Sequence, residues 1–241
     1  MSATDSNLKL GLWSGVGLCI ASMVGSGVFL SSGYMAQDMA AGPILLAWVV
    51  GAILAMLGAR AYAALAMELP RSGGEYRYLS ELAHPALGYV AGWVTVFIGF
   101  AQPTAINARA AADFAGTIVP IDSPRLVAAA LLLLVAAGHA LGHSSSRWLQ
   151  NLLVWAKVLL LIGFALMGVF KGSHQWPSWS PPSGSTELSA FVGSLFYIGY
   201  AFSGWNTAAY AAEEFERPRK DVARAMLIGC ALVAVFYMLV N

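Results

Sequence analysis

The chain has 241 residues, of which 59% are hydrophobic and only 10% are charged. Soluble domains average about 25% charged residues, so this composition excludes an ordinary soluble protein and indicates a membrane protein. The formal net charge of +1 suggests no nucleic-acid partner. Both cysteines, Cys19 and Cys230, lie within apolar runs, and we expect free, unreactive thiols rather than a disulfide framework.

Apolar runs long enough to cross a bilayer predict seven membrane spans. In chain order they cover residues 11–34, 43–69, 86–112, 125–142, 149–170, 188–212 and 222–241. Pro43, Pro85 and Pro124 stand at or just before the starts of three spans, where a missing backbone N–H costs least. The proline-rich segment at residues 174–185 is expected to be a loop outside the membrane.

The basic residues predict that the N-terminus is cytoplasmic. Basic residues are enriched in the cytoplasmic loops of membrane proteins. With this topology the cytoplasmic side holds Lys9, Arg71, Arg77, Arg147, Arg217, Arg219, Lys220 and Arg224, and the outer side holds Arg125 and Lys171. We therefore expect a multi-pass protein of the cell membrane, surrounded by the lipid bilayer.

The first span contains Gly25-Ser26-Gly27 in its middle. Glycine and serine are poor helix formers, and open backbone at membrane depth is tolerated only where it is buried in protein or lines a cavity. An interruption here would offer backbone N–H groups to a carboxylate. It would also offer carbonyl groups near Met23 to an ammonium group. The alternative is a face of small residues that lets two helices pack closely, and both interpretations fit this segment.

The sixth span is interrupted in the same way, by Ser203-Gly204-Trp205-Asn206. Tyr200, Ala201 and Phe202 precede the interruption, so aromatic rings could close over a ligand and freed carbonyls could accept from an ammonium group. Asn206 is a polar, uncharged residue at depth that could hold either the loop or the ligand. The alternative is an aromatic packing cluster, although the position within the span argues against an interfacial belt.

The two interrupted spans are the first and the sixth, which is the separation expected if five helices form one structural repeat. This interpretation makes the chain a single transmembrane domain over residues 1–241. The first repeat covers about residues 11–170, and a second repeat begins within residues 188–241. Only two helices of that second repeat are present, so we expect a fold truncated after about seven transmembrane helices.

Lys157 lies about a third of the way across the fifth span from its cytoplasmic end. A lysine inside the membrane is costly and indicates a function, here the exchange of a proton, although snorkelling to the interface is the alternative. Arg60 and Arg109 could snorkel or pair with a carboxylate. The sequence contains no serine–histidine or paired-carboxylate arrangement at one depth, so we expect no enzyme and no cofactor. His139 and His143 are four residues apart but have no carboxylate or thiol nearby, so we expect no metal site.

Three segments together resemble a known family. Val24-Gly25-Ser26-Gly27-Val28-Phe29 is similar to the first-helix signature of the amino acid–polyamine–organocation (APC) superfamily, as is the segment at residues 69–79. The run Phe202-Ser203-Gly204-Trp205-Asn206, with the acidic and basic residues at 213–219, resembles the sixth-helix region of its L-type-like amino acid permeases.

This resemblance implies an all-α membrane fold of the leucine-transporter type, with two inverted five-helix repeats followed by two further helices. It implies a secondary active transporter of amino acids or related amines that works by alternating access. The substrate carboxylate would meet the backbone of Gly25, Ser26 and Gly27, and the ammonium group would meet the carbonyls of Met23, Tyr200, Ala201 and Ser203.

The resemblance also suggests roles for single side chains. Tyr200 falls at the position where the family has an aromatic gate. Asn206 falls at the position of a polar residue that supports the broken sixth helix. The Lys157 ammonium would stand in for a sodium ion, which favours sodium-independent, proton-coupled uptake or exchange. The chain departs from the family in length, because members have about twelve helices. A fragment, a half-transporter that needs a second chain, and a non-transporting scaffold or sensor are therefore alternatives.

Overall fold

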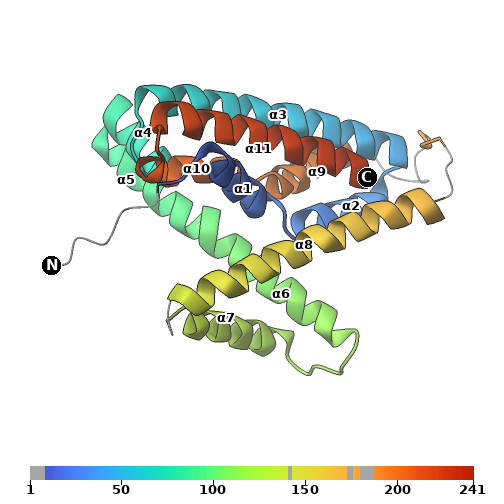
Figure 1. Cartoon of the computed structure of the whole chain (residues 1–241). Helices are drawn as coiled ribbons and strands as arrows, with labels where there is room; N and C mark the ends of the chain where they lie inside the picture. The colour runs from blue at the N-terminus through green and yellow to red at the C-terminus, as the bar shows by residue number, and fades with distance from the viewer. Residues whose placement is uncertain (1–8, 141–142, 173–175, 180–186) are drawn as a thin grey trace. The chain divides into compact units, whose positions relative to one another are not determined.

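The computed structural model describes residues 9–140, 143–172, 176–179 and 187–241. These residues fold almost entirely into helices (Figure 1). In chain order the elements are α1 (Leu12–Met23), α2 (Gly27–Asp38), α3 (Ala41–Glu68), α4 (Gly74–Leu82), α5 (Pro85–Val94), the π-helix η1 (Thr95–Ala101), α6 (Gln102–Gly116), α7 (Pro124–Ala140), α8 (His143–Lys171), α9 (Glu187–Ala201), α10 (Thr207–Tyr210), the 3₁₀ turn η2 (Ala212–Glu214) and α11 (Pro218–Val240). Of the loop predicted at residues 174–185, only residues 176–179 are described.

In the part of the chain that the structure describes, each of the seven predicted spans overlaps with helix, and the first and sixth are interrupted. Among the described residues, four helices are long and apolar enough to cross a membrane, namely Leu12–Asp38, Ala41–Glu68, Pro85–Gly116 and Pro218–Val240. Pro124–Gly138 and Leu188–Ala201 are shorter apolar helices. Pro85 and Pro124 are the first residues of α5 and α7, as the missing N–H predicts. The prediction of an all-α membrane fold is confirmed.

The described residues divide into two compact units. The first unit comprises the chain up to Tyr78 and from Lys157 onward. Within it, α11 packs along α3 and α1, and α9 packs against α2 and α3 (Figure 1). The large side chains buried in its core include those of Trp48, Phe202, Phe215 and Tyr237.

Helix α3 reaches its neighbours through a stripe of small residues. Its buried residues recur every four positions at Ala47, Gly51, Ala55, Ala59 and Ala63. Lipid tails are as apolar as side chains, so helices in a membrane associate through close van der Waals contact, which small residues permit. A Cβ at Gly51 would overlap with Cγ2 of Ile198 on α9, which shows how closely these two helices approach.

The second unit comprises residues 79–156. Here α5, η1 and α6 form one continuous helix, Pro85–Gly116, and α6 packs on α7 through Ala108, Ala112 and Ala128. The π-helical segment ends immediately before Gln102 and Pro103. Proline has no N–H for the helical ladder, which accounts for irregular helix at this point.

Candidate functional site

The first predicted break is present in the structure. Helix α1 ends at Met23, Val24 takes up extended backbone with ψ of 104°, and α2 begins at Gly27. Met23 and Gly27 are buried, whereas Gly25 and Ser26 are half-buried. The interruption predicted from Gly25-Ser26-Gly27 is therefore confirmed.

The second predicted break separates α9 from α10. Gly204 has a φ of +115°, a conformation that favours glycine, and its carbonyl accepts hydrogen bonds from both the N–H and the hydroxyl of Thr207, at 3.1 and 2.6 Å. The carbonyl of Tyr200 accepts from the N–H of Ser203 at 3.1 Å. Ser203 is exposed, and Tyr200 and Asn206 are half-buried. The chain thus leaves the helical path between Ala201 and Thr207.

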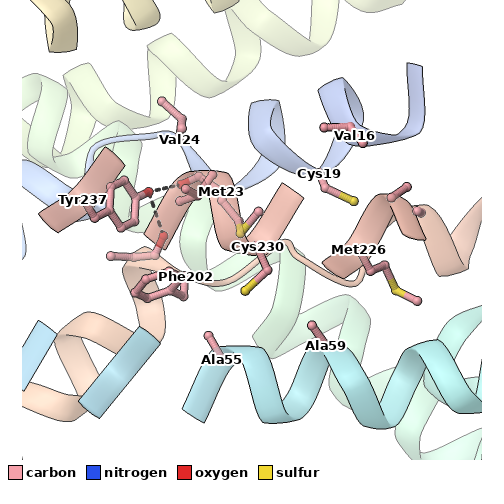
Figure 2. Close-up of a cluster of buried hydrophobic side chains, with 14 of the residues drawn as sticks. Val16, Cys19, Met23, Val24, Ala55, Ala59, Phe202, Met226, Cys230 and Tyr237 are labelled. Carbon is pink, nitrogen blue, oxygen red and sulfur yellow. Dashed lines mark hydrogen bonds between the residues drawn. The ribbon is translucent and has the colours of Figure 1, made fainter. Parts of the chain in front are cut away.

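One hydroxyl group joins the two breaks. The hydroxyl of Tyr237 on α11 lies 2.8 Å from the carbonyl oxygen of Met23 and 3.0 Å from that of Ala201 (Figure 2). Tyr237 is fully buried, so these bonds are shielded from water. Two carbonyls at the ends of α1 and α9, far apart in sequence, therefore face the same point in space. A hydroxyl has only one hydrogen, so it donates fully to one carbonyl at a time.

The glycines of the breaks also permit close contact between them. A Cβ at Gly27 would lie 2.8 Å from Cα of Ala201 and 3.3 Å from the Tyr200 ring. A Cβ at Gly204 would lie 2.9 Å from the carbonyl carbon of Ser22. Gly25 differs, since the nearest atom to an added Cβ would be the Met23 oxygen at 4.0 Å. The close contact at Gly27 is what the packing interpretation expects, and Gly25 has no such contact; a role of either residue in substrate binding stays a prediction.

The side chain of Phe202 belongs to an aromatic cluster. Its ring centroid lies 5.1 Å from that of Tyr237 and 6.2 Å from that of Trp48, and the Trp48 and Tyr237 rings are 5.3 Å apart. Phe202 is only 2% exposed. Contacts of Phe202 with a substrate, and the role of Tyr200 as a gate, stay predictions.

Asn206 is held by an acidic residue that follows α3. Its Nδ2 donates to Oε1 of Glu75 at 2.7 Å, and the hydroxyl of Tyr210 donates to Oε2 of Glu75 at 2.7 Å. Burial, assisted by the charge of Glu75, raises the pKa of nearby Tyr78 to about 12, so its hydroxyl stays neutral. Asn206 is therefore bonded to the segment that follows α3, and both its role in supporting the loop and a contact with the ligand stay predictions.

Lys157 lies on α8 with its side chain exposed. The described residues therefore do not provide the burial that its position along the fifth span suggested, and its coupling role stays a prediction.

The two arginines within the predicted spans differ in their surroundings. Arg60 is exposed. Arg109 pairs with a carboxylate, because its Nε lies 2.9 Å from Asp113 one helical turn away. Among the described residues no group of three or more His, Cys, Asp or Glu side chains could hold a metal ion.

Two important contacts were not anticipated from the sequence. Tyr237 looks like one more aromatic residue near the end of an apolar span, and its carbonyl partners are 214 and 36 positions away. Glu75 stands in the segment at residues 69–79 that carried the family resemblance, and a carboxylate directly after two glycines was the available signal.

Comparisons with known proteins indicate the family to which this chain belongs. A family model described as amino acid permease matches residues 10–241. The b(0,+)-type amino acid transporter 1 of Mus musculus is 31% identical over 251 residues, which cover 100% of this chain and 52% of the relative. The Asc-type amino acid transporter 1 of Homo sapiens is 31% identical over 97% of this chain and 47% of its own length.

A third relative is the large neutral amino acids transporter small subunit 2 of Oryctolagus cuniculus, which is 30% identical over 97% of this chain and 46% of its own length. The chain spans about half the length of these curated relatives. The family match covers both breaks and nearly the whole sequence. The chain therefore belongs to the amino acid permease family of the APC superfamily, and it is a multi-pass membrane protein.

Proposed function

We propose that this chain serves secondary active transport of amino acids or related amines, by alternating access around its two helix breaks. The observation that carries the proposal is the convergence of the Met23 and Ala201 carbonyls on one hydroxyl group, in a chain of the amino acid permease family. The proposal is of a permease rather than an enzyme, and it includes no cofactor.

The two breaks suit the two charges of an amino acid. The N-terminus of α2 follows Gly25 and Ser26, and the positive end of a helix dipole with its unpaired N–H groups favours a carboxylate. The carbonyls of Met23 and Ala201 share the single hydroxyl hydrogen of Tyr237. A carbonyl oxygen has two lone pairs, so both of these groups can also accept a bond from a substrate ammonium, and the proposal includes the carbonyl of Tyr200 as a third acceptor.

The test of this function is binding and flux. Radiolabelled amino acids are offered to the purified chain, and uptake is measured in proteoliposomes with the chain and with a version carrying any reading frame that continues beyond Asn241. We expect saturable binding that is displaced by amino acids with both charges free, and not by N-acetylated or esterified forms. Absence of binding, together with absence of flux in both versions, contradicts the proposal.

We propose further that transport is sodium-independent and coupled to protons or to amino acid exchange, with Lys157 as the coupling group. Replacing Lys157 by alanine removes the only group in this proposal that exchanges a proton. We therefore expect the rate of uptake to fall at least tenfold, or uptake to lose its dependence on pH. Membrane insertion should be unchanged. Lys171→Ala, at the C-terminal end of the same helix, is the matched control and should transport like the wild type. Uptake by Lys157→Ala with the wild-type pH dependence contradicts the coupling role.

The distribution of basic residues supports a cytoplasmic N-terminus in the cell membrane. Single cysteines introduced at Lys9 and at exposed Trp176 report on this topology, because the native Cys19 and Cys230 are buried. In intact cells a membrane-impermeant maleimide is expected to label the cysteine at position 176 and to reach the one at position 9 only after permeabilisation. The reverse pattern contradicts the orientation.

A second candidate function is a half-transporter that needs another chain, or a scaffold or sensor without flux. The relatives that the chain matches over about half of their length are named transporters. One of these relatives is itself named a small subunit. This alternative predicts binding or assembly with a partner chain in pull-down experiments, and no uptake by the chain alone.

A further inference from the structure

A polar cluster next to the second break connects the segment that follows α3 with the segment around α10. Each carboxylate oxygen of Glu75 accepts a hydrogen bond at 2.7 Å, one from Asn206 and one from Tyr210. Nδ2 of Asn206 also lies 3.1 Å from the Tyr210 hydroxyl. The three side chains therefore form a closed triangle around one half-buried carboxylate. Hydrogen bonds to an ionised acceptor are roughly twice as strong as neutral ones, so this triangle is a firm connection.

The backbone directs Glu75 toward the break. Gly73 and Gly74 have φ angles of +123° and +51°, which turn the chain sharply after α3 and place Glu75 in the first turn of α4. A Cβ at Gly74 would lie 2.6 Å from the Tyr210 ring. Glycine at this position thus permits both the turn and the close approach of Tyr210.

Further bonds join the same two segments. The N–H of Glu213 donates to the hydroxyl of Ser72 at 3.0 Å, and Nη1 of Arg219 donates to the carbonyl of Met67 at 3.0 Å. Together with the two bonds to Glu75, they attach residues 67–75 to residues 206–219. Asn206 immediately precedes the short helix α10, and Tyr210 is the last residue of that helix, so the attachment begins where the second break ends.

We propose that Glu75 is a positioning residue for the second break. Its carboxylate holds Asn206 and Tyr210, and thereby keeps the irregular backbone of residues 200–206 where its carbonyls can receive the substrate ammonium. This inference rests on the proposed function for its link to substrate, but not for its structural part. Glu75 itself does not contact the substrate.

The test exchanges the two partners without changing their shape. Asn206→Asp places two carboxylates within hydrogen-bond distance, so we expect KM to rise more than tenfold. Glu75→Gln leaves one donor of the triangle without an acceptor, so we expect KM to rise about threefold. In Glu75→Gln/Asn206→Asp the carboxylate and the amide exchange places, and KM should return to within twofold of the wild type. Glu68→Gln, which neutralises an exposed carboxylate at the end of α3, is the control and should leave KM unchanged.

A purely structural role would reduce the amount of inserted protein and hence Vmax, and it would leave KM unchanged. Hydrogen exchange measured by mass spectrometry on the same purified variants provides a readout that needs no transport. We expect amides in residues 203–211 to exchange faster in Asn206→Asp, and at the wild-type rate in the exchanged pair. A double variant no better than Asn206→Asp in either measurement overturns the inference. If the wild type binds no amino acid, the proposed function fails, and hydrogen exchange still decides the role of Glu75.

Discussion

Removing the Tyr237 hydroxyl by Tyr237→Phe is expected to loosen the connection between the two helix breaks while the helices remain packed. The phenylalanine ring keeps its contacts with Trp48 and Phe202, whose centroids lie 5.3 and 5.1 Å away. The carbonyls of Met23 and Ala201 lose the donor that lies 2.8 and 3.0 Å from them. Burying a carbonyl without its partner costs about 1–3 kcal/mol. We therefore expect the free energy of unfolding to fall by that amount.

The same variant is expected to bind amino acids about tenfold more weakly, because the Met23 and Ala201 carbonyls are no longer held in place. A tenfold change in affinity corresponds to only about 1.4 kcal/mol of binding free energy. Affinity is measured by radioligand binding, and stability by thermal unfolding in detergent. Tyr78→Phe is the matched control, since Tyr78 is buried and its hydroxyl has no hydrogen-bond partner among the described residues. Equal losses of affinity in the two variants would show that the hydroxyl of Tyr237 has no particular role at the breaks.

Alanine at Gly27 is expected to lower stability, whereas alanine at Gly25 is expected to leave it unchanged. At Gly27 the new methyl group would lie 2.8 Å from the backbone Cα of Ala201, which cannot move without shifting the end of α9. Overpacking of this kind typically costs about 1–3 kcal/mol. For a chain of this size each kcal/mol lowers the melting temperature by roughly 2–4 °C. At Gly25 the nearest atom would be 4.0 Å away, so Gly25→Ala should melt like the wild type.

This pair of variants separates the two interpretations of Gly25-Ser26-Gly27. The methyl group at Gly25 enters the space assigned to the substrate, so we expect Gly25→Ala to fold normally and to bind amino acids at least fivefold more weakly. Melting temperature and radioligand affinity are measured on the same preparations. Wild-type affinity in Gly25→Ala would argue against a substrate site beside this residue, and an equal fall in melting temperature would make both glycines packing residues.

The helices and their interruptions could be predicted because both depend on local properties. Long apolar runs require a helix in lipid, since every backbone group must be paired within the segment. Prolines then mark the starts, as at Pro85 and Pro124. The breaks were visible because glycine and serine are poor helix formers in the middle of a span.

The contacts of single side chains could not be predicted in the same way. Lys157 illustrates the limit, because its position in the span gives its depth along the helix but not the direction in which its side chain points. The same limit applies to Gly25 and Gly27, which share one motif and differ in what surrounds them.

The sequence by itself determined that this is a helical membrane protein of the amino acid permease family with two interrupted helices. Only the tertiary structure decided that the two interruptions meet at the hydroxyl of Tyr237, and that Glu75 holds Asn206. The physical reason is the distance along the chain over which each interaction acts. Helix formation and helix breaking depend on neighbours within a few residues, whereas these hydrogen bonds join groups 36 to 214 positions apart that meet only when the helices pack.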